Sequence, residues 1–96
     1  MHIISRKKLK DFWDRHPDSK NALSAWYKIV DKTKFTTLND LKKTFAKADL
    51  VRGKVIFDIG GNKYRLIAVI HFNRGKVYIR DVLTHEEYDK GEWKNG

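Results

Sequence analysis

The chain opens with a short strand pattern followed by a helical one. Two β-branched isoleucines within residues 2–5 predict a first strand, and Ser5 is the expected cap of the helix that follows. This helix is predicted from Arg6 to about His16, because Pro17 ends it and three apolar residues fall on one stripe: Leu9, Phe12 and Trp13.

Two more helices are predicted before the pattern changes. The second covers about 19–32, is capped by Asp18 or Ser19, and keeps a 3.6-residue apolar period through Ala22, Ala25, Trp26, Ile29 and Val30. The third follows the threonines at 36–37 and runs to about residue 48, with an apolar side made of Leu38, Leu41 and Phe45. The first two helices are expected to pair antiparallel across a tight turn.

Beyond Gly53 the apolar period becomes that of β-strands. Three β-rich runs, at 55–59, 63–72 and 76–83, are separated by Gly60-Gly61-Asn62 and Asn73-Arg74-Gly75. Glycine and asparagine supply the positive φ angles of tight hairpin turns, so these runs predict an antiparallel meander. The middle run carries apolar residues on both faces, which is typical of a central strand.

The tail contains a capping-box sequence, Thr84-His85-Glu86-Glu87, which predicts a short last helix to about Asp89. Trp93 is expected to fold back onto the domain. The predicted fold class is α+β: one domain over 1–96, with the N-terminal strand and the helices packed on one face of the meander and the other face open.

Composition narrows the range of functions. The 96 residues include 21 Lys and Arg against 12 Asp and Glu, a net charge of +9 that favours a polyanionic partner such as nucleic acid. The chain has no cysteine, which excludes disulfides and thiol chemistry, and its four histidines lack the spacing of a helical metal site, so we expect neither metal nor cofactor. No apolar run approaches membrane-spanning length, and we expect a cytoplasmic protein.

Several side chains near the end of the meander have the chemistry of RNA cleavage. His85 and Tyr88 share one side of a helical turn, and Arg65 and Arg80 lie on neighbouring strands. A histidine, which titrates at about pH 6.5, moves protons, and arginines stabilise phosphate charge. Taken singly, these residues favour a structural interpretation: His85 is an ordinary residue of the helix start, and Tyr88 is more often a packing residue. For Arg65, a pair with Asp58 across the hairpin is about as well supported as a functional role. His16 and His71 are interpreted as structural residues.

Three motifs together resemble the HigB family of toxins, within the RelE-like superfamily: Phe57 to Leu66, Val77 to Arg80, and Thr84 to Asp89. The resemblance implies a RelE-like fold and metal-independent cutting of mRNA in the ribosomal A site. It also implies that Arg65 contacts the scissile phosphate, that His85 is the acid or base, and that Tyr88 stacks on a base or transfers a proton. The other expected RNA contacts are Lys54, Asn62, Lys63, Arg74 and Arg80.

The same resemblance implies a partner, a helix-turn-helix antitoxin of the HigA kind that covers or distorts the active face. Two alternatives remain open from the sequence. One is a ParE-like toxin, which has the same fold, poisons a topoisomerase and cuts nothing. The other is a non-catalytic RNA-binding or ribosome-binding module that uses the basic sheet.

Overall fold

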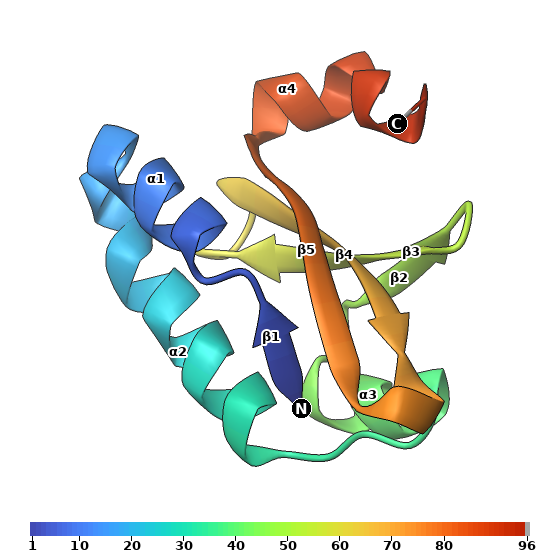
Figure 1. Ribbon diagram of the computed structural model, residues 1–96. Coiled ribbons are helices and arrows are strands. Elements are labelled where there is room, and N and C mark those ends of the chain that lie inside the picture. The colour runs from blue at the N-terminus through green and yellow to red at the C-terminus, as the bar shows by residue number, and fades with distance from the viewer. Residues whose placement is uncertain (96) are drawn as a thin grey trace.

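The computed structural model describes residues 1–95 and confirms an α+β fold, in which a five-stranded sheet carries the first three helices on one face and the last helix apart from them (Figure 1). Short 3-10 turns, labelled η, connect several elements. In chain order the elements are β1 His2–Ile4, α1 Lys7–Arg15, η1 Pro17–Ser19, α2 Lys20–Lys32, α3 Leu38–Thr44, β2 Asp49–Val51, β3 Lys54–Ile59, β4 Tyr64–His71, η2 Phe72–Arg74, β5 Lys76–Thr84, α4 His85–Lys90 and η3 Glu92–Asn95.

The sheet has the strand order β1-β5-β4-β3-β2, so β4 is central, as its two apolar faces predict. Strands β3, β4 and β5 form the predicted antiparallel meander. The N-terminal strand β1, however, belongs to the sheet rather than to the layer that covers it, and it pairs parallel with β5, with Ile3 opposite Val77. The sheet is therefore mixed rather than purely antiparallel.

Strand β2 was not predicted from the sequence. It forms a hairpin with β3 across the two-residue turn Arg52-Gly53, in which both φ angles are positive, at 52° and 78°. This backbone suits a type I′ hairpin, which ordinarily has asparagine or aspartate before the glycine. Because arginine occupies that position, the sequence lacks the usual signal for this turn. The three residues of β2 are also too few to show strand periodicity.

The main core lies between the helices and one sheet face. Leu23, Trp26 and Val30 of α2 are buried against this face, whereas Ile29 is 41% exposed. The predicted apolar stripe of this helix is therefore rotated toward Leu23. The largest buried side chains that the rest of the chain adds to this core are Leu9, Phe12, Phe35, Leu41, Phe57, Leu66 and Val77.

The C-terminal segment covers part of the opposite sheet face, which was expected to be open. Trp93 is 7% exposed and packs on Ile56 and Ile67, which confirms the prediction that it folds back onto the domain. Its indole N–H donates to the Tyr88 carbonyl at 3.0 Å, and Lys54 Nζ donates to the Trp93 carbonyl, also at 3.0 Å. A second, smaller apolar cluster therefore ties α4 and η3 to the sheet.

A β-bulge interrupts the pairing of β5 with β4. Ile67 lies opposite Asp81 but Ala68 lies opposite Ile79, so Arg80 is an extra residue without a cross-strand partner. The bulge lets both Ile79 and Val82 face the core although they are three residues apart. Arg80 is left exposed.

The helix caps follow the predictions only in part. Thr37 caps α3, and Thr84 forms the predicted capping box with Glu87. Ser5 does not cap α1, which begins after Arg6 without a side-chain cap among residues 1–95. Ser19 precedes α2, but its hydroxyl donates to the His16 carbonyl at 2.7 Å instead of capping the helix.

We predict that Thr84→Ala lowers the free energy of unfolding by about 1 kcal/mol, because it removes the side-chain acceptor for the Glu87 N–H. Thr84→Ser, which keeps the hydroxyl, is the matched control and is expected to stay close to wild type. Urea denaturation of the three proteins measures the difference. Equal destabilisation by serine and alanine would contradict the capping role.

The capping box also predicts a pH dependence. The hydrogen bond from the Thr84 N–H is the main cause that holds the pKa of the Glu87 carboxyl below its ordinary value. A carboxyl whose folded-state pKa is lowered stabilises the protein above its unfolded pKa, about 4.3, and this contribution disappears as the pH falls through the lower folded-state value. The difference in the free energy of unfolding between wild type and Glu87→Gln, measured by urea denaturation, should therefore shrink as the pH is lowered from 7 to 3. A difference that stays constant over this range would contradict the role of the Glu87 carboxylate.

Candidate functional site

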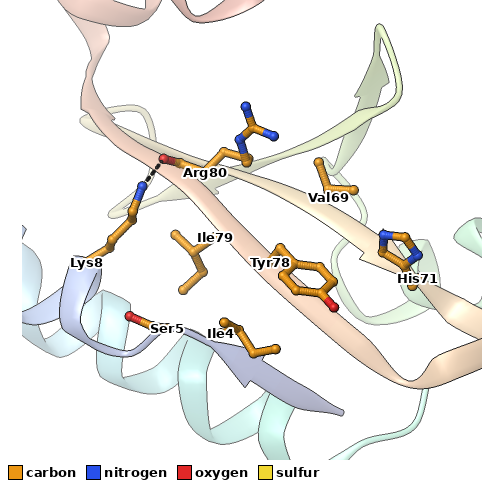
Figure 2. A pocket seen from close by; sticks show the side chains of 8 residues that line it. All are labelled: Ile4, Ser5, Lys8, Val69, His71, Tyr78, Ile79 and Arg80. Carbon is orange, nitrogen blue, oxygen red and sulfur yellow. Dashed lines mark hydrogen bonds between the residues drawn. The ribbon is translucent and has the colours of Figure 1, made fainter. Parts of the chain in front are cut away.

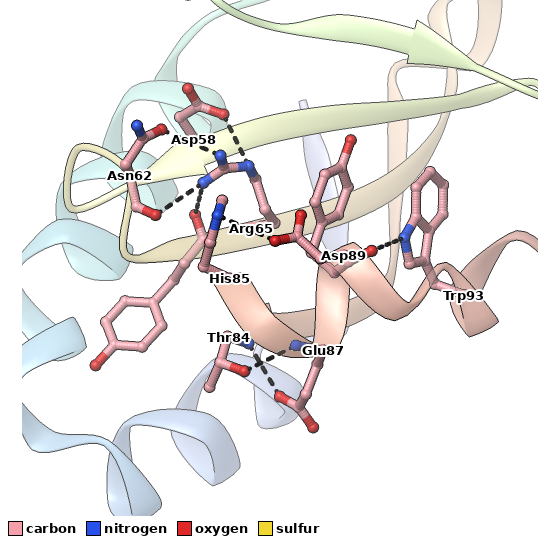
Figure 3. Close-up of polar contacts among 10 residues, drawn as sticks. Asp58, Asn62, Arg65, Thr84, His85, Glu87, Asp89 and Trp93 are labelled. Atoms are coloured by element: carbon pink, nitrogen blue, oxygen red, sulfur yellow. Dashed lines mark hydrogen bonds and ion pairs between the residues drawn. The ribbon is translucent and has the colours of Figure 1, made fainter.

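Three of the residues singled out from the sequence meet where the β3–β4 turn approaches the start of α4 (Figure 3). The His85 N–H donates to the Lys63 carbonyl at 3.0 Å and so fixes the first residue of α4 beside the turn. The guanidinium carbon of Arg65 lies 5.3 Å from the centre of the Tyr88 ring. The fold thus brings together Arg65, His85 and Tyr88.

Arg65 is nearly buried on the central strand, with 8% of its surface exposed. Its Nε lies 3.2 Å from Asp58 Oδ1, so the pairing across the hairpin that the sequence left open does form. Nη2 donates to the Asn62 side chain at 3.1 Å, and Nη1 donates to the carbonyls of Asn62 and Tyr64 at 3.2 and 3.1 Å. These contacts engage all three guanidinium nitrogens and hold the β3–β4 turn in place.

His85 is more accessible than Arg65 and Tyr88. Its Nε2 lies 3.2 Å from Asp89 Oδ2, and both side chains are more than half exposed. The carboxylate orients the imidazole and leaves Nδ1 without a hydrogen-bond partner among residues 1–95. Sequence reasoning missed Asp89 as a site residue, although its i, i+4 spacing from His85 on a helix was the available signal.

Both faces of the Tyr88 ring are occupied. The Arg65 guanidinium covers one face, and Trp93 stacks on the ring at 5.1 Å between centroids with an interplanar angle of 10°. This arrangement argues against the expectation that Tyr88 stacks on an RNA base. Its hydroxyl makes no hydrogen bond to any residue in the described range 1–95, so the phenol oxygen is free to contact a ligand.

The other expected RNA contacts are dispersed. Lys54 is buried beneath the C-terminal segment, which argues against a contact with RNA, and Asn62 supports Arg65. Arg74 lies in η2, at the other end of β4 from Arg65. Arg80 is exposed at the bulge of β5.

Lys63 lies on the exposed side of the β3–β4 turn and ties it to the first helices. Its Nζ forms a surface ion pair with Asp18 Oδ2 at 3.3 Å, and the Tyr64 hydroxyl donates to Asp18 Oδ1 at 2.7 Å. The Tyr64 hydrogen bond is the main cause that lowers the pKa of the Asp18 carboxyl, and the same bond raises the pKa of Tyr64. The site is thereby braced by η1 as well as by α4.

Within residues 1–95, no group of three or more His, Asp or Glu side chains is placed to hold a metal ion. In that same range, no helix is long and apolar enough to span a membrane.

Comparison with known proteins places the site inside a matched region. The model of a family described as HigB_toxin, RelE-like toxic component of a toxin-antitoxin system, matches residues 19–91. The mRNA interferase toxin HigB of Escherichia coli (strain K12) is 37% identical over 92 residues, which cover 93% of this chain and 88% of that protein. The mRNA interferase HigB of Shigella flexneri matches equally well. All the site residues described above, except Asp18 and Trp93, lie within the family match.

We predict that Asp58→Ala destabilises the fold by roughly 2 kcal/mol, because it leaves the nearly buried Arg65 without its ion-pair partner. This value lies below the range for a fully buried pair, since the Asp58 side chain is 25% exposed. In a double-mutant cycle, Asp58→Ala should cost less in an Arg65→Met background than in wild type. Additive losses in urea denaturation would show that the two side chains do not interact.

Proposed function

This chain belongs to the HigB family of RelE-like toxins, and we propose that it is an endoribonuclease that cuts mRNA on translating ribosomes by metal-independent acid–base chemistry. The observation that carries the proposal is the His85–Asp89 pair next to Arg65 and Tyr88, in a chain 37% identical to a HigB mRNA interferase. A net charge of +9 suits a polyanionic substrate.

RNA supplies its own nucleophile for this reaction. A base removes the proton of a 2′-hydroxyl, the 2′-oxygen forms a bond to the adjacent phosphorus, and the bond from phosphorus to the 5′-oxygen breaks. A proton must reach the departing 5′-oxygen, and the products are a 2′,3′-cyclic phosphate and a 5′-hydroxyl. The protein must therefore provide a base, an acid and positive charge at the phosphate.

His85 is the residue that we propose to exchange protons with RNA, because its side chain is more than half exposed and Asp89 engages only Nε2, which leaves Nδ1 free for the substrate. The hydroxyl of Tyr88 is the second proton-transfer group that we propose. Arg65 supplies positive charge from beneath the site, while most of its hydrogen bonds hold Asn62 and the turn. Lys63, 68% exposed at the side chain, adds a cation at the rim.

The family is the toxic half of a toxin–antitoxin system, so an antitoxin is a partner of this protein. We propose that this antitoxin is a helix-turn-helix protein of the HigA kind, and that one of its acidic segments meets the basic surface. Ribosomal RNA would be attracted by the same charge, which supports action on the ribosome.

The relatives favour RNA cleavage over the two alternatives. They carry the name mRNA interferase, and an exposed histidine oriented by a carboxylate has no evident task in a ParE-like protein that only binds. The same pair would be superfluous in a non-catalytic RNA-binding module. Growth arrest on overexpression separates the toxin from the non-catalytic module, and cleavage of a message separates it from both alternatives.

We predict that His85→Ala lowers the rate of mRNA cleavage on ribosomes by about 100-fold or more, because it removes the proton-transfer group. Asp89→Asn keeps the shape but weakens the orientation of the ring, and a smaller loss is expected. His2→Ala, at an exposed position on the edge strand, is the matched control and should cut like wild type. Primer extension on a defined message in a purified translation system measures all four proteins.

Two results would contradict the proposal. If the message remains intact with the wild-type protein, the chain does not cleave mRNA under translation. If His85→Ala, still folded by circular dichroism, cuts as fast as His2→Ala, His85 is not the proton-transfer group. A parallel reaction with the same message free of ribosomes tests the ribosome requirement.

A further inference from the structure

A groove of about 460 Å³ opens on the sheet face away from α1 and α2, between β1, β4 and β5 (Figure 2). Ile4 and Val69 contribute apolar side chains, and His71 and Tyr78 add an aromatic pair. Lys8 and Arg80 also line the groove, and no carboxylate is found among the described residues that line it. An apolar floor with an unbalanced positive rim fits an anionic ligand that has a flat apolar part.

The aromatic pair leaves a stacking surface in the groove. The rings of His71 and Tyr78 are 5.3 Å apart and meet at 78°, an edge-to-face contact that uses at most one face of Tyr78. His71 is exposed and Tyr78 is half-buried, so neither ring is closed inside the core. His71, interpreted from the sequence as structural, therefore lines a surface groove. Figure 2 shows both rings on the same side of β4 and β5 as Val69.

The bulge in β5 supplies the cation. It leaves Arg80 exposed two residues from Tyr78, and its guanidinium has no hydrogen-bond or ion-pair partner in the range 1–95. Lys8 Nζ donates to the Arg80 carbonyl at 2.8 Å and so holds the bulged backbone from α1 (Figure 2). An unpaired guanidinium and a stacking ring that line one groove can bind the phosphate and the base of one nucleotide.

The groove lies on the same strand as the proposed cleavage site. Tyr78 and Thr84 are six residues apart on β5, a distance of about 20 Å along a strand. Between the two sites, Trp93 covers Ile67, and the segment that carries Trp93 exposes Lys90 and Lys94. The same surface also carries Asp81 and Glu92, so a single strand that crosses this segment meets charges of both signs.

We propose that this groove binds one nucleotide of the single-stranded RNA substrate, with its base stacked on Tyr78 and its phosphate on Arg80, a few nucleotides from the scissile bond. The inference rests on the proposed function in taking RNA as the ligand. It also assigns base stacking to Tyr78, an open ring, in place of Tyr88, whose two faces are occupied. The site gives the enzyme a contact with a base remote from the reaction.

The test measures binding of a fluorescent single-stranded RNA by fluorescence anisotropy, in the His85→Ala background so that the RNA stays intact. Tyr78→Ala should weaken binding roughly tenfold, because it removes one base–aromatic stack. Tyr78→Phe keeps the ring and is the matched control, expected near wild-type affinity. Arg80→Gln should weaken binding and flatten its salt dependence, since one phosphate contact is lost.

A series of RNAs with one abasic nucleotide each then locates the contact. One position should lower the affinity of the Tyr78 protein roughly tenfold and leave that of Tyr78→Ala unchanged. The proposal is overturned if no position shows this coupling, if Tyr78→Ala binds like Tyr78→Phe, or if the RNA does not bind. It is equally overturned if Tyr78→Ala leaves RNA binding intact and only impairs neutralisation by the antitoxin.

These outcomes are separate from those of the cleavage assay. Coupled binding at one base without cleavage of any message by wild type would support the groove and refute the endoribonuclease proposal. If Tyr78→Ala cleaves the message as efficiently as wild type, and no abasic position shows coupling to Tyr78, the endoribonuclease proposal is supported and the groove proposal is refuted.

Discussion

A buried positive charge on the central strand organises the candidate functional site of this protein. Arg65 has 8% of its surface exposed, and a guanidinium at that depth is tolerated only with opposite charge and hydrogen-bond acceptors around it. Asp58 on the neighbouring strand supplies the charge, and Asn62 and the backbone of the turn supply the acceptors. The shape of the β3–β4 turn is therefore a consequence of placing an arginine inside the sheet.

The position of the last helix follows from the same charge. The Arg65 guanidinium covers one face of Tyr88, Trp93 covers the other, and Lys54 holds the Trp93 carbonyl. These contacts fix α4 against the sheet, and the Thr84 capping box fixes where it begins. His85, the first residue of α4, is thereby placed next to the turn. The groups proposed to transfer protons thus stand on a rigid support, while their reactive atoms remain exposed.

The sequence predicted the parts of this structure that depend on local patterns. The meander, the central position of β4 and the capping box at Thr84 all follow from periodicity or from turn and cap residues. Contacts between distant residues were not predictable. Lys54 looked like a surface cation until Trp93, 39 residues later, was found to cover it. The sequence likewise did not show that Trp93 and Arg65 cover the Tyr88 ring, which was therefore expected to be open for stacking.

The bulge at Arg80 shows how a requirement of the core can generate a surface site. Strict alternation along β5 would turn Val82 to the open face if Ile79 stayed in the core. One extra residue resolves this conflict, and that residue cannot pair across the sheet. Because it is an arginine two residues from Tyr78, the packing of one face provides the groove on the other face with both a cation and a ring. Core geometry and ligand chemistry are then coupled through a single backbone irregularity.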